Sequence, residues 1–143
     1  MIELQSGRKL PLADLLALYD AVGWSAYTRD SENLARAIAN STYVMTAWQG
    51  EALVGLARCL SDDVAICYVQ DILVTPALQG QGVGKRLLIA CLERFAHVRM
   101  CALMTDDEPR QLRFYESLGF TNTQALANVM NAFVYFGAPQ KED

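Results

Sequence analysis

The chain reads Val69-Gln-Asp-Ile-Leu-Val-Thr-Pro-Ala-Leu-Gln-Gly-Gln-Gly-Val-Gly-Lys-Arg-Leu-Leu88, an order that predicts a strand, a glycine-rich loop and a helix in direct succession. The apolar strand runs to Val74, and the loop Gln79–Gly84 opens into the helix. Glycine adopts positive φ values without strain and lets a ligand approach the backbone closely. Backbone N–H groups then point outward at a helix N-terminus, where the helix dipole also favours an anion. The stretch is therefore predicted to bind a phosphate group.

The spacing of the glycines narrows the kind of phosphate site. A Walker loop needs Gly-x-x-x-x-Gly-Lys-Ser/Thr, which is not present here. A dinucleotide fold needs Gly-x-Gly-x-x-Gly after the first strand and an acidic residue about 20 positions later, and this mid-chain loop has neither. For a glycine triplet taken alone, a tight strand-to-helix turn without a ligand is the alternative.

Two motifs resemble those of the GNAT superfamily of N-acetyltransferases. Gln79, Gly82 and Gly84 match the pattern Gln/Arg-x-x-Gly-x-Gly/Ala. About 30 residues downstream, Phe114-Tyr-Glu-Ser-Leu-Gly-Phe120 resembles Phe/Leu-Tyr-x-x-x-Gly-Phe. The resemblance covers residues 43–137 well, and the first 40 residues correspond to the variable region on the acceptor side of the family. It implies an α/β fold with a mixed central sheet of about six to seven strands, helices on both faces and a splayed central strand pair.

Hydrophobic periodicity and turn residues predict the elements of this fold. The expected elements are a strand at 2–4, helices at 12–22 and 31–40, a hairpin of 43–48 and 52–59, a central strand at 65–74, a helix at 82–95, a strand at 100–104, a helix at 109–119, a weak strand near Thr121 and a last strand over Asn128–Phe136. The chain length of 143 residues fits one domain spanning residues 1–143.

Composition limits the partners that we expect. Hydrophobic residues make up 52% of the chain, but no apolar run reaches the roughly 18 residues of a membrane span. The beginning of the chain does not resemble a secretory signal. A net charge of −4 argues against nucleic-acid binding. We expect a cytoplasmic protein, a monomer or homodimer, that binds no metal. Its thiols should be reduced and lie in the core: Cys59, Cys67, Cys91 and Cys101.

The resemblance implies that acetyl-CoA is the cosubstrate. Its pyrophosphate suits the loop residues, which are Gln79, Gly80, Gln81, Gly82, Val83 and Gly84. The pantetheine arm carries two amides and can pair with a strand edge, in this family the end of the central strand at Ile72, Leu73 and Val74. A backbone N–H of that edge would also hold the thioester oxygen. Glu108 stands where the family often has an asparagine that holds the pantetheine. Lys85 and Arg86 fit a solvated helix surface better than a phosphate site.

Tyr115 is the candidate catalytic residue. In the family, the tyrosine of this motif gives a proton to the departing CoA thiolate, which is general acid catalysis. The alternative is a tyrosine that packs its ring on the sheet. The general base is missing from its usual positions, because Gln70 replaces a glutamate on the central strand and Leu103 replaces one on the next strand. Asp71 is ionisable, but strand alternation would place it on the face opposite Gln70.

The acceptor is expected to be the primary amine of a small molecule. Trp24 and Tyr27 lie in the variable N-terminal region, and together with Gln70 and Asp71 they are the candidate acceptor-binding residues. Aromatic residues that fasten two helices to the sheet are an equal alternative for Trp24 and Tyr27. Two other functions stay open: a CoA-binding module without turnover, and an acetyltransferase acting on proteins or peptides.

Overall fold

The computed structural model describes residues 1–137, which form parts of two compact units, residues 1–103 and residues from Met104 onward. Each unit is described by itself. The first unit holds, in chain order, β1 (Ile2–Ser6), α1 (Leu12–Ala21), α2 (Ser25–Thr28), α3 (Ser31–Ala39), β2 (Tyr43–Gln49), β3 (Ala52–Ser61), β4 (Ile66–Val74), α4 (Val83–Arg94) and β5 (Met100–Leu103). The second holds α5 (Pro109–Ser117) and a short 3₁₀ turn, Thr123–Ala125.

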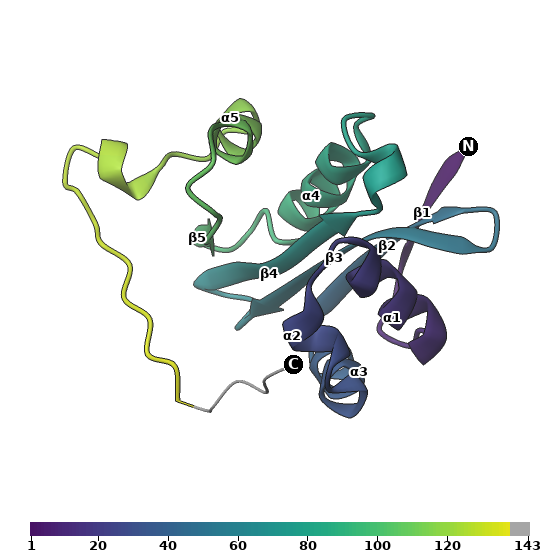
Figure 1. Cartoon of the computed structure of the whole chain (residues 1–143). Helices are drawn as coiled ribbons and strands as arrows, with labels where there is room; N and C mark the ends of the chain where they lie inside the picture. The colour runs from purple at the N-terminus through teal and green to yellow at the C-terminus, as the bar shows by residue number, and fades with distance from the viewer. Residues whose placement is uncertain (138–143) are drawn as a thin grey trace. The chain divides into compact units, whose positions relative to one another are not determined.

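The first unit is built on a mixed five-stranded sheet with the strand order β1-β2-β3-β4-β5 (Figure 1). Neighbouring strands are antiparallel from β1 to β4, and β4 and β5 are parallel. The expectation of an α/β fold with a mixed sheet and helices on both faces is confirmed, as α1 to α3 lie on one face and α4 on the other.

Apolar periodicity accounts for the core on the α1 side of the sheet. Leucines at one face of α1 and two apolar residues of α3 pack on β3 and β4. This cluster of almost fully buried side chains comprises Leu15, Leu18, Tyr19, Leu34, Ile38, Val44, Leu53, Leu56 and Leu73. On the opposite face, Leu87 of α4 approaches β3 closely at Gly55, where a Cβ atom would lie only 3.0 Å from the Leu87 Cδ1 atom. The absent side chain therefore lets α4 pack tightly against the sheet.

The ladder between β3 and β4 contains a β-bulge at Gln70. Arg58 pairs with Asp71 and the next residue, Cys59, pairs with Val69, so Gln70 has no residue opposite it. A bulge inserts one extra residue into one strand and turns side chains away from strict alternation. Strict alternation therefore does not by itself fix the faces of Gln70 and Asp71 at this position. Gln70 is exposed and Asp71 is buried.

The four cysteines gather on the α4 side of the sheet, and three of them are buried. Contact with Cys101 lowers the pKa of Cys67, but contact with Cys59 and burial outweigh it and raise that pKa to about 12. Contact with Cys67 and burial raise the pKa of Cys101. All four are free thiols. No three metal-ligating side chains within residues 1–137 are arranged so that they could hold a metal ion.

The second unit departs from the expected strands. Neither the segment near Thr121 nor residues Asn128–Phe136 form a strand; the first is followed by a 3₁₀ turn and the second is extended without a ladder partner. A strand forms only where a neighbouring strand shares its backbone hydrogen bonds. The apolar pattern of residues 128–136 predicts a strand, but no ladder partner for it is present among residues 1–137. No helix of the described residues is long and apolar enough to cross a membrane.

Candidate functional site

The loop between β4 and α4 exposes a row of free backbone donors. Gly80 and Gly82 have φ values of +80° and +86°, which only glycine adopts easily. Gly82 directly precedes the first residue of α4. Within residues 1–137, the N–H groups of residues 81–84 donate to no other residue. Unpaired N–H groups at the N-terminus of a twelve-residue helix form a site with the chemistry to bind an anion.

Gln79 fixes this loop to the end of the strand. Its Nε2 atom donates to the carbonyl oxygen of Val74 at 3.0 Å. The two basic residues that follow the glycines are placed differently from each other. Arg86 donates to the carbonyl of Ile2 at 3.0 Å and so joins α4 to β1, whereas Lys85 is exposed. The guanidinium group of Arg86 is therefore engaged in a hydrogen bond within the protein.

The ladder between β4 and β5 covers only the first half of β4. Its last pair is Val69 with Leu103, and β4 continues for five more residues, 70–74. The parallel arrangement of the two strands is confirmed. Within the described chain, the second half of β4 therefore has no strand partner on the β5 side.

Alternation along β4 shows which backbone groups this free edge presents. Thr75 donates its N–H to the carbonyl of Val54 in the β3 hairpin at 2.8 Å. In an antiparallel ladder every second residue bonds to the same neighbour, so Leu73 also points its backbone groups toward β3. Ile72 and Val74 point theirs away from β3. The Val74 carbonyl is held by Gln79, which leaves the N–H groups of Ile72 and Val74 and the Ile72 carbonyl directed toward the free side.

Asp71 lies on the α1 side of the sheet, within a buried polar cluster. Its side chain is only 3% exposed, and its carboxylate accepts from Arg58 Nε at 2.5 Å, from the Tyr19 hydroxyl at 3.0 Å and from the Tyr27 hydroxyl at 2.8 Å. Arg58 also donates to the Tyr27 hydroxyl at 3.2 Å and to Ser41 Oγ at 3.4 Å. We call Tyr19, Tyr27, Arg58 and Asp71 the ion-pair cluster.

The protonation states in this cluster follow from burial and charge. Burial and the negative charge of Asp71 raise the pKa of the Tyr19 hydroxyl, and the same two causes, in the same order, raise the pKa of Tyr27. Burial disfavours the charge of Arg58, but Asp71 and Tyr27 outweigh it and raise the arginine pKa. Both tyrosines are therefore neutral hydrogen-bond donors at physiological pH, while Arg58 remains charged. Asp71 is held as a structural partner and has little exposed surface to offer an acceptor.

The two tyrosine rings of the ion-pair cluster pack against each other and against Trp24. Tyr19 makes edge-on contacts with Trp24 and Tyr27, with ring centroids 5.9 Å and 5.1 Å apart, and the centroids of Trp24 and Tyr27 are 6.3 Å apart. Trp24 and Tyr27 are half-buried and pack against the core. A hydrogen bond with the amide of Gln70 lowers the pKa of the Tyr27 hydroxyl, but burial and the charge of Asp71 outweigh it. The structure therefore brings together all four candidate acceptor residues, with Tyr27 joining Gln70 to Asp71.

Two residues of this cluster, Arg58 and Tyr19, were not singled out from the sequence. A signal for Arg58 existed, because a basic residue stands alone in the apolar run Ala52–Cys59. A buried charge requires a partner of opposite sign, and Asp71 stands in an apolar strand in the same way. Tyr19 gave no such signal, because its helical spacing is that of an ordinary core residue.

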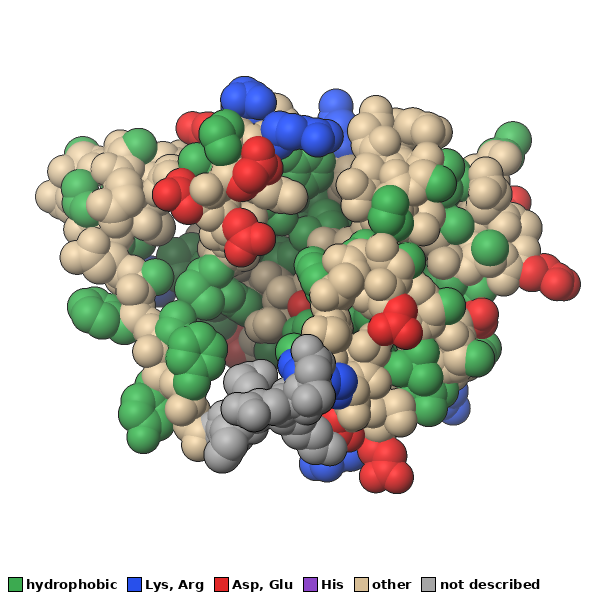
Figure 2. All heavy atoms as spheres, viewed as in Figure 1, with side chains coloured by type: hydrophobic (Ala, Val, Ile, Leu, Met, Phe, Trp, Pro, Cys, Tyr) green, Lys and Arg blue, Asp and Glu red, His purple; other side chains and the backbone are tan. Residues whose placement is uncertain are grey.

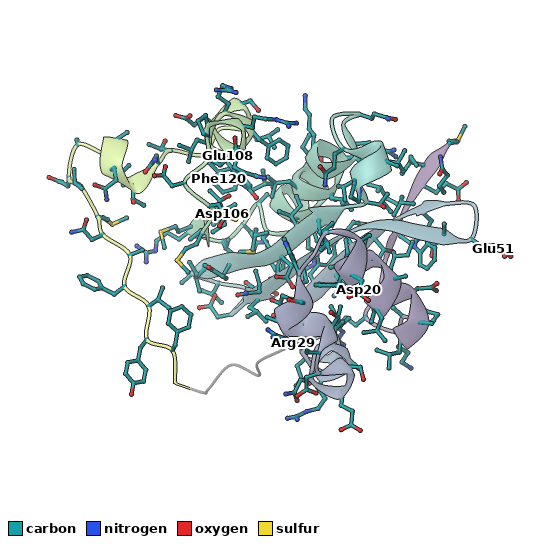
Figure 3. All side chains as sticks on the ribbon, in the orientation of Figure 1. Asp20, Arg29, Glu51, Asp106, Glu108 and Phe120 are labelled. Carbon is teal, nitrogen blue, oxygen red and sulfur yellow. The ribbon has the colours of Figure 1, made fainter. Side chains whose placement is uncertain are left out.

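The remaining candidate residues lie in the second unit. The carboxylate of Glu108 accepts from the N–H groups of Arg110 and Gln111, so Glu108 is the N-cap of α5 (Figure 3). Tyr115 is buried to 8% exposure, and its ring contacts Phe114 and Phe120 edge-on. Burial raises the pKa of the Tyr115 hydroxyl. That hydroxyl makes no hydrogen bond within residues 1–137 and is not sealed from solvent.

Comparison with known proteins gives a consistent result. A family model described as an acetyltransferase (GNAT) domain matches residues 18–133. A histone acetyltransferase of Glycine max, TAP1, is 31% identical over 130 residues, which cover 83% of this chain and 55% of that protein. The chain spans between 55% and 70% of the length of three curated relatives that it matches.

Two solved structures show the fold. A GNAT-family acetyltransferase of Streptococcus pneumoniae, SP0256, superposes with a TM-score of 0.84 at 30% identity and covers 97% of this chain and 100% of its own. The aminoglycoside N-acetyltransferase AAC(6')-Iy in complex with CoA superposes with a TM-score of 0.72 at 17% identity and covers 95% of this chain and 94% of its own.

The buried ion pair makes a testable contribution to stability. Asp71→Asn leaves the buried Arg58 charge without a counter-charge, so we expect the free energy of unfolding to fall by roughly 3–5 kcal/mol in urea denaturation. Arg58→Met should have a similar effect. The double variant Arg58→Met/Asp71→Leu should be clearly less destabilised than the sum of the two single variants, because it leaves no unpaired charge.

The exposed pair of Arg94 and Asp63, joined at 3.3 Å, is the control for this measurement. Asp63→Asn should change the stability little, since exposed pairs contribute little. Strictly additive effects at Arg58 and Asp71 would contradict the role assigned to the pair.

Proposed function

This chain belongs to the GNAT acetyltransferase family, and we propose that it transfers an acetyl group from acetyl-CoA to the primary amine of a small molecule. The observation that carries the proposal is the row of unpaired N–H groups at the start of α4, next to a β4 edge whose donors are also free. A pyrophosphate and a peptide-like arm need two such adjacent surfaces, one for each.

The loop supplies the phosphate contacts in this proposal. The N–H groups of residues 81–84 donate to the pyrophosphate oxygens, and Gln79 holds the loop against the strand end. Positive φ at Gly80 and Gly82 keeps side chains out of the approach. Lys85 is exposed and adds a general positive charge, while Arg86 is occupied with β1.

The β4 edge supplies the contacts for the rest of the cosubstrate. The pantetheine amides add to the edge as a strand would, by pairing with the backbone of Val74 and Ile72. The N–H of Ile72 is directed to the same side, where it can stabilise the negative oxygen that forms during acyl transfer. Leu73 contributes packing, because its backbone groups face β3 and its side chain is buried.

Transfer proceeds by direct attack of the amine. The neutral amine nitrogen bonds to the acetyl carbonyl carbon, the carbonyl oxygen becomes negative, and the carbon–sulfur bond then breaks. Tyr115 gives its proton to the departing thiolate and regains one from water, and the nitrogen, which is positively charged after the attack, loses a proton to water to give the neutral amide. The raised pKa of Tyr115 keeps the hydroxyl protonated, so it can act as an acid at physiological pH. Gln70 cannot accept a proton and Asp71 is enclosed by three donors, so the amine loses its proton to water or arrives neutral.

The half-buried aromatic side chains of Trp24 and Tyr27 favour a small cationic acceptor. The face of an aromatic ring attracts an ammonium group, and hydrogen bonds with Arg58 and Asp71 hold Tyr27 in place. The neighbour AAC(6')-Iy is named for an aminoglycoside, a small polyamine. The relative TAP1 is named as a histone acetyltransferase, so a protein acceptor is the second candidate. A CoA-binding module without turnover is the third.

An amine panel tests the proposed activity. Small primary amines, polyamines and a lysine-containing peptide are each incubated with the protein and acetyl-CoA, and the acetylated product is followed by mass spectrometry. We expect turnover of at least one small amine, and we expect Trp24→Ala to raise the KM for that amine much more than the KM for acetyl-CoA. Turnover of the peptide alone would favour a protein acceptor, and CoA binding without any product would favour the binding module.

Glycine replacement tests the phosphate site. Gly82→Ala should weaken CoA binding at least tenfold, about 1.4 kcal/mol, in isothermal titration calorimetry. A Cβ at Gly82 meets no protein atom within 4 Å, so the loss would reflect a shifted loop or a clash with the ligand. Gly50 is a matched control, because it also has positive φ and open space but lies in the β2–β3 turn. Equal CoA affinity in wild type and Gly82→Ala would remove the loop from the site.

Tyr115→Phe tests the general acid, because it keeps the ring and removes only the hydroxyl. General acid catalysis commonly contributes 10²–10⁴-fold. A thiolate leaves fairly well without help, so we expect a loss in kcat of roughly tenfold or more, with stability and CoA affinity little changed. The pH–rate profile of wild type should show no loss from Tyr115 until the pH exceeds 10, because burial raises its pKa above that ordinary value. Wild-type turnover by Tyr115→Phe would make this tyrosine structural.

A further inference from the structure

The side chain of Gln70 lies on the same side of the sheet as that of Asp71, because of the β-bulge. Cys67 is one of the thiols on the α4 side, and alternation then turns Gln70, three positions later, toward the α1 side. The bulge interrupts the alternation at the next step. The hydrogen bond of Asp71 with Tyr27 of α2 shows that this side chain also faces the helices. Two successive side chains of β4 therefore lie beside the same tyrosine.

Gln70 is not committed to the sheet or to the core. No residue of β3 lies opposite it, and its side chain is exposed. It follows Val69, the last residue of β4 that pairs with β5, so it stands where the free edge of β4 begins. In the proposed complex the cosubstrate arm runs along this edge from Val74 to Ile72. Two residues of a strand span roughly 6.6 Å, so Gln70 is near a thioester held at Ile72.

The partners of Tyr27 decide which way the amide of Gln70 is turned. A hydroxyl group donates one hydrogen bond and accepts up to two. The Tyr27 hydroxyl donates to Asp71 at 2.8 Å and accepts from Arg58 at 3.2 Å. It has only an accepting position left, so Gln70 can bond to it only through its NH₂ group. The contact with Gln70 acts to lower the pKa of Tyr27, as a donor to the phenol oxygen does.

We propose that the side-chain carbonyl oxygen of Gln70 accepts a hydrogen bond from an N–H of the incoming amine, and that Tyr27 is a positioning residue that holds the amide in this orientation. This role rests on the function proposed above and adds the atom that receives the acceptor. A carbonyl oxygen binds an N–H without taking its proton. Gln70 therefore holds the nitrogen in place, and the buried ion pair of Arg58 and Asp71 acts on the acceptor through Tyr27.

The surface on this side of the sheet suits a hydrophilic acceptor. Figure 2 shows acidic side chains, in red, over the helices α1 and α3, with basic side chains, in blue, among them. Asp20 at the end of α1 and Glu32 at the start of α3 are exposed. An amine can thus approach the α1 side over a polar surface.

A double-mutant cycle tests the positioning role, using the small amine with the highest turnover in the panel. Gln70→Ala and Tyr27→Phe should each lower kcat/KM for the amine roughly twofold to tenfold, mainly through KM, because each removes one hydrogen bond that holds the acceptor. The KM for acetyl-CoA should not change. In the Gln70→Ala background, Tyr27→Phe should cause no further loss. Additive losses overturn the proposal, because they show that Tyr27 does not act through Gln70.

Tyr43→Phe is the matched control for the cycle. Tyr43 is also half-buried, but its ring packs against Phe95 at the end of α4. Its hydroxyl can be removed without touching the acceptor side, so kcat/KM for the amine should stay at the wild-type value. A loss equal to that of Tyr27→Phe would show that the effect is not specific and would overturn the proposal.

Nuclear magnetic resonance of the Gln70 side-chain amide needs no turnover. Its two N–H signals, identified by their loss in Gln70→Ala, should be shifted from free glutamine in wild type and return to the free positions in Tyr27→Phe. Free positions already in wild type overturn the positioning by Tyr27. If no amine is acetylated, the proposed function fails and the role of Gln70 fails with it. If an amine is acetylated and Gln70→Ala keeps wild-type kinetics, only the role of Gln70 fails.

Discussion

The buried ion pair between Arg58 and Asp71 is the interaction on which the α1 side of the sheet, the proposed acceptor side, depends. It joins neighbouring positions of β3 and β4, and two tyrosines bring α1 and α2 onto the same carboxylate. Burying two charges is costly, and the cost is offset here because every strong donor and acceptor of the pair finds a partner. A consequence is that α2, a helix of only four residues, is held by polar contacts where its length provides few apolar ones.

β4 combines two sides of the proposed chemistry in one strand. The side chain of Asp71 anchors the proposed acceptor region, while the backbone of Ile72 and Val74 presents donors on the free edge. The bulge at Gln70 separates the stretch paired with β5 from the stretch that is open. Bulges commonly occur beside functional sites because they redirect side chains and end strand pairing. At Gln70 the register of β3 and β4 shifts, and the pairing of β4 with β5 ends at the preceding residue, Val69.

The sequence predicts well whatever depends on local chemistry. The strand, the loop and α4 were located correctly because glycine position, apolar period and the helix start are all local signals. The bulge at Gln70 could not be foreseen, because a one-residue shift in register depends on how β3 fits β4. Arg58 could be suspected from its isolated charge, but which acid pairs with it depends on the strand register. The last strand was predicted from composition, yet forming it needs a neighbouring strand that no local pattern specifies.

The buried thiols have a consequence for a protein that would release a free thiol at each turnover. Thiol–disulfide exchange requires an exposed thiolate as the attacking group. Contact with Cys101 lowers the pKa of Cys67, but contact with Cys59 and burial outweigh it and raise that pKa to about 12. Cys59 and Cys91 are also enclosed between the sheet and α4. Coenzyme A disulfides formed from the product would therefore find no reactive partner among these three side chains. The packing that fills the space beneath α4 also makes these cysteines resistant to the redox chemistry of the reaction's own product.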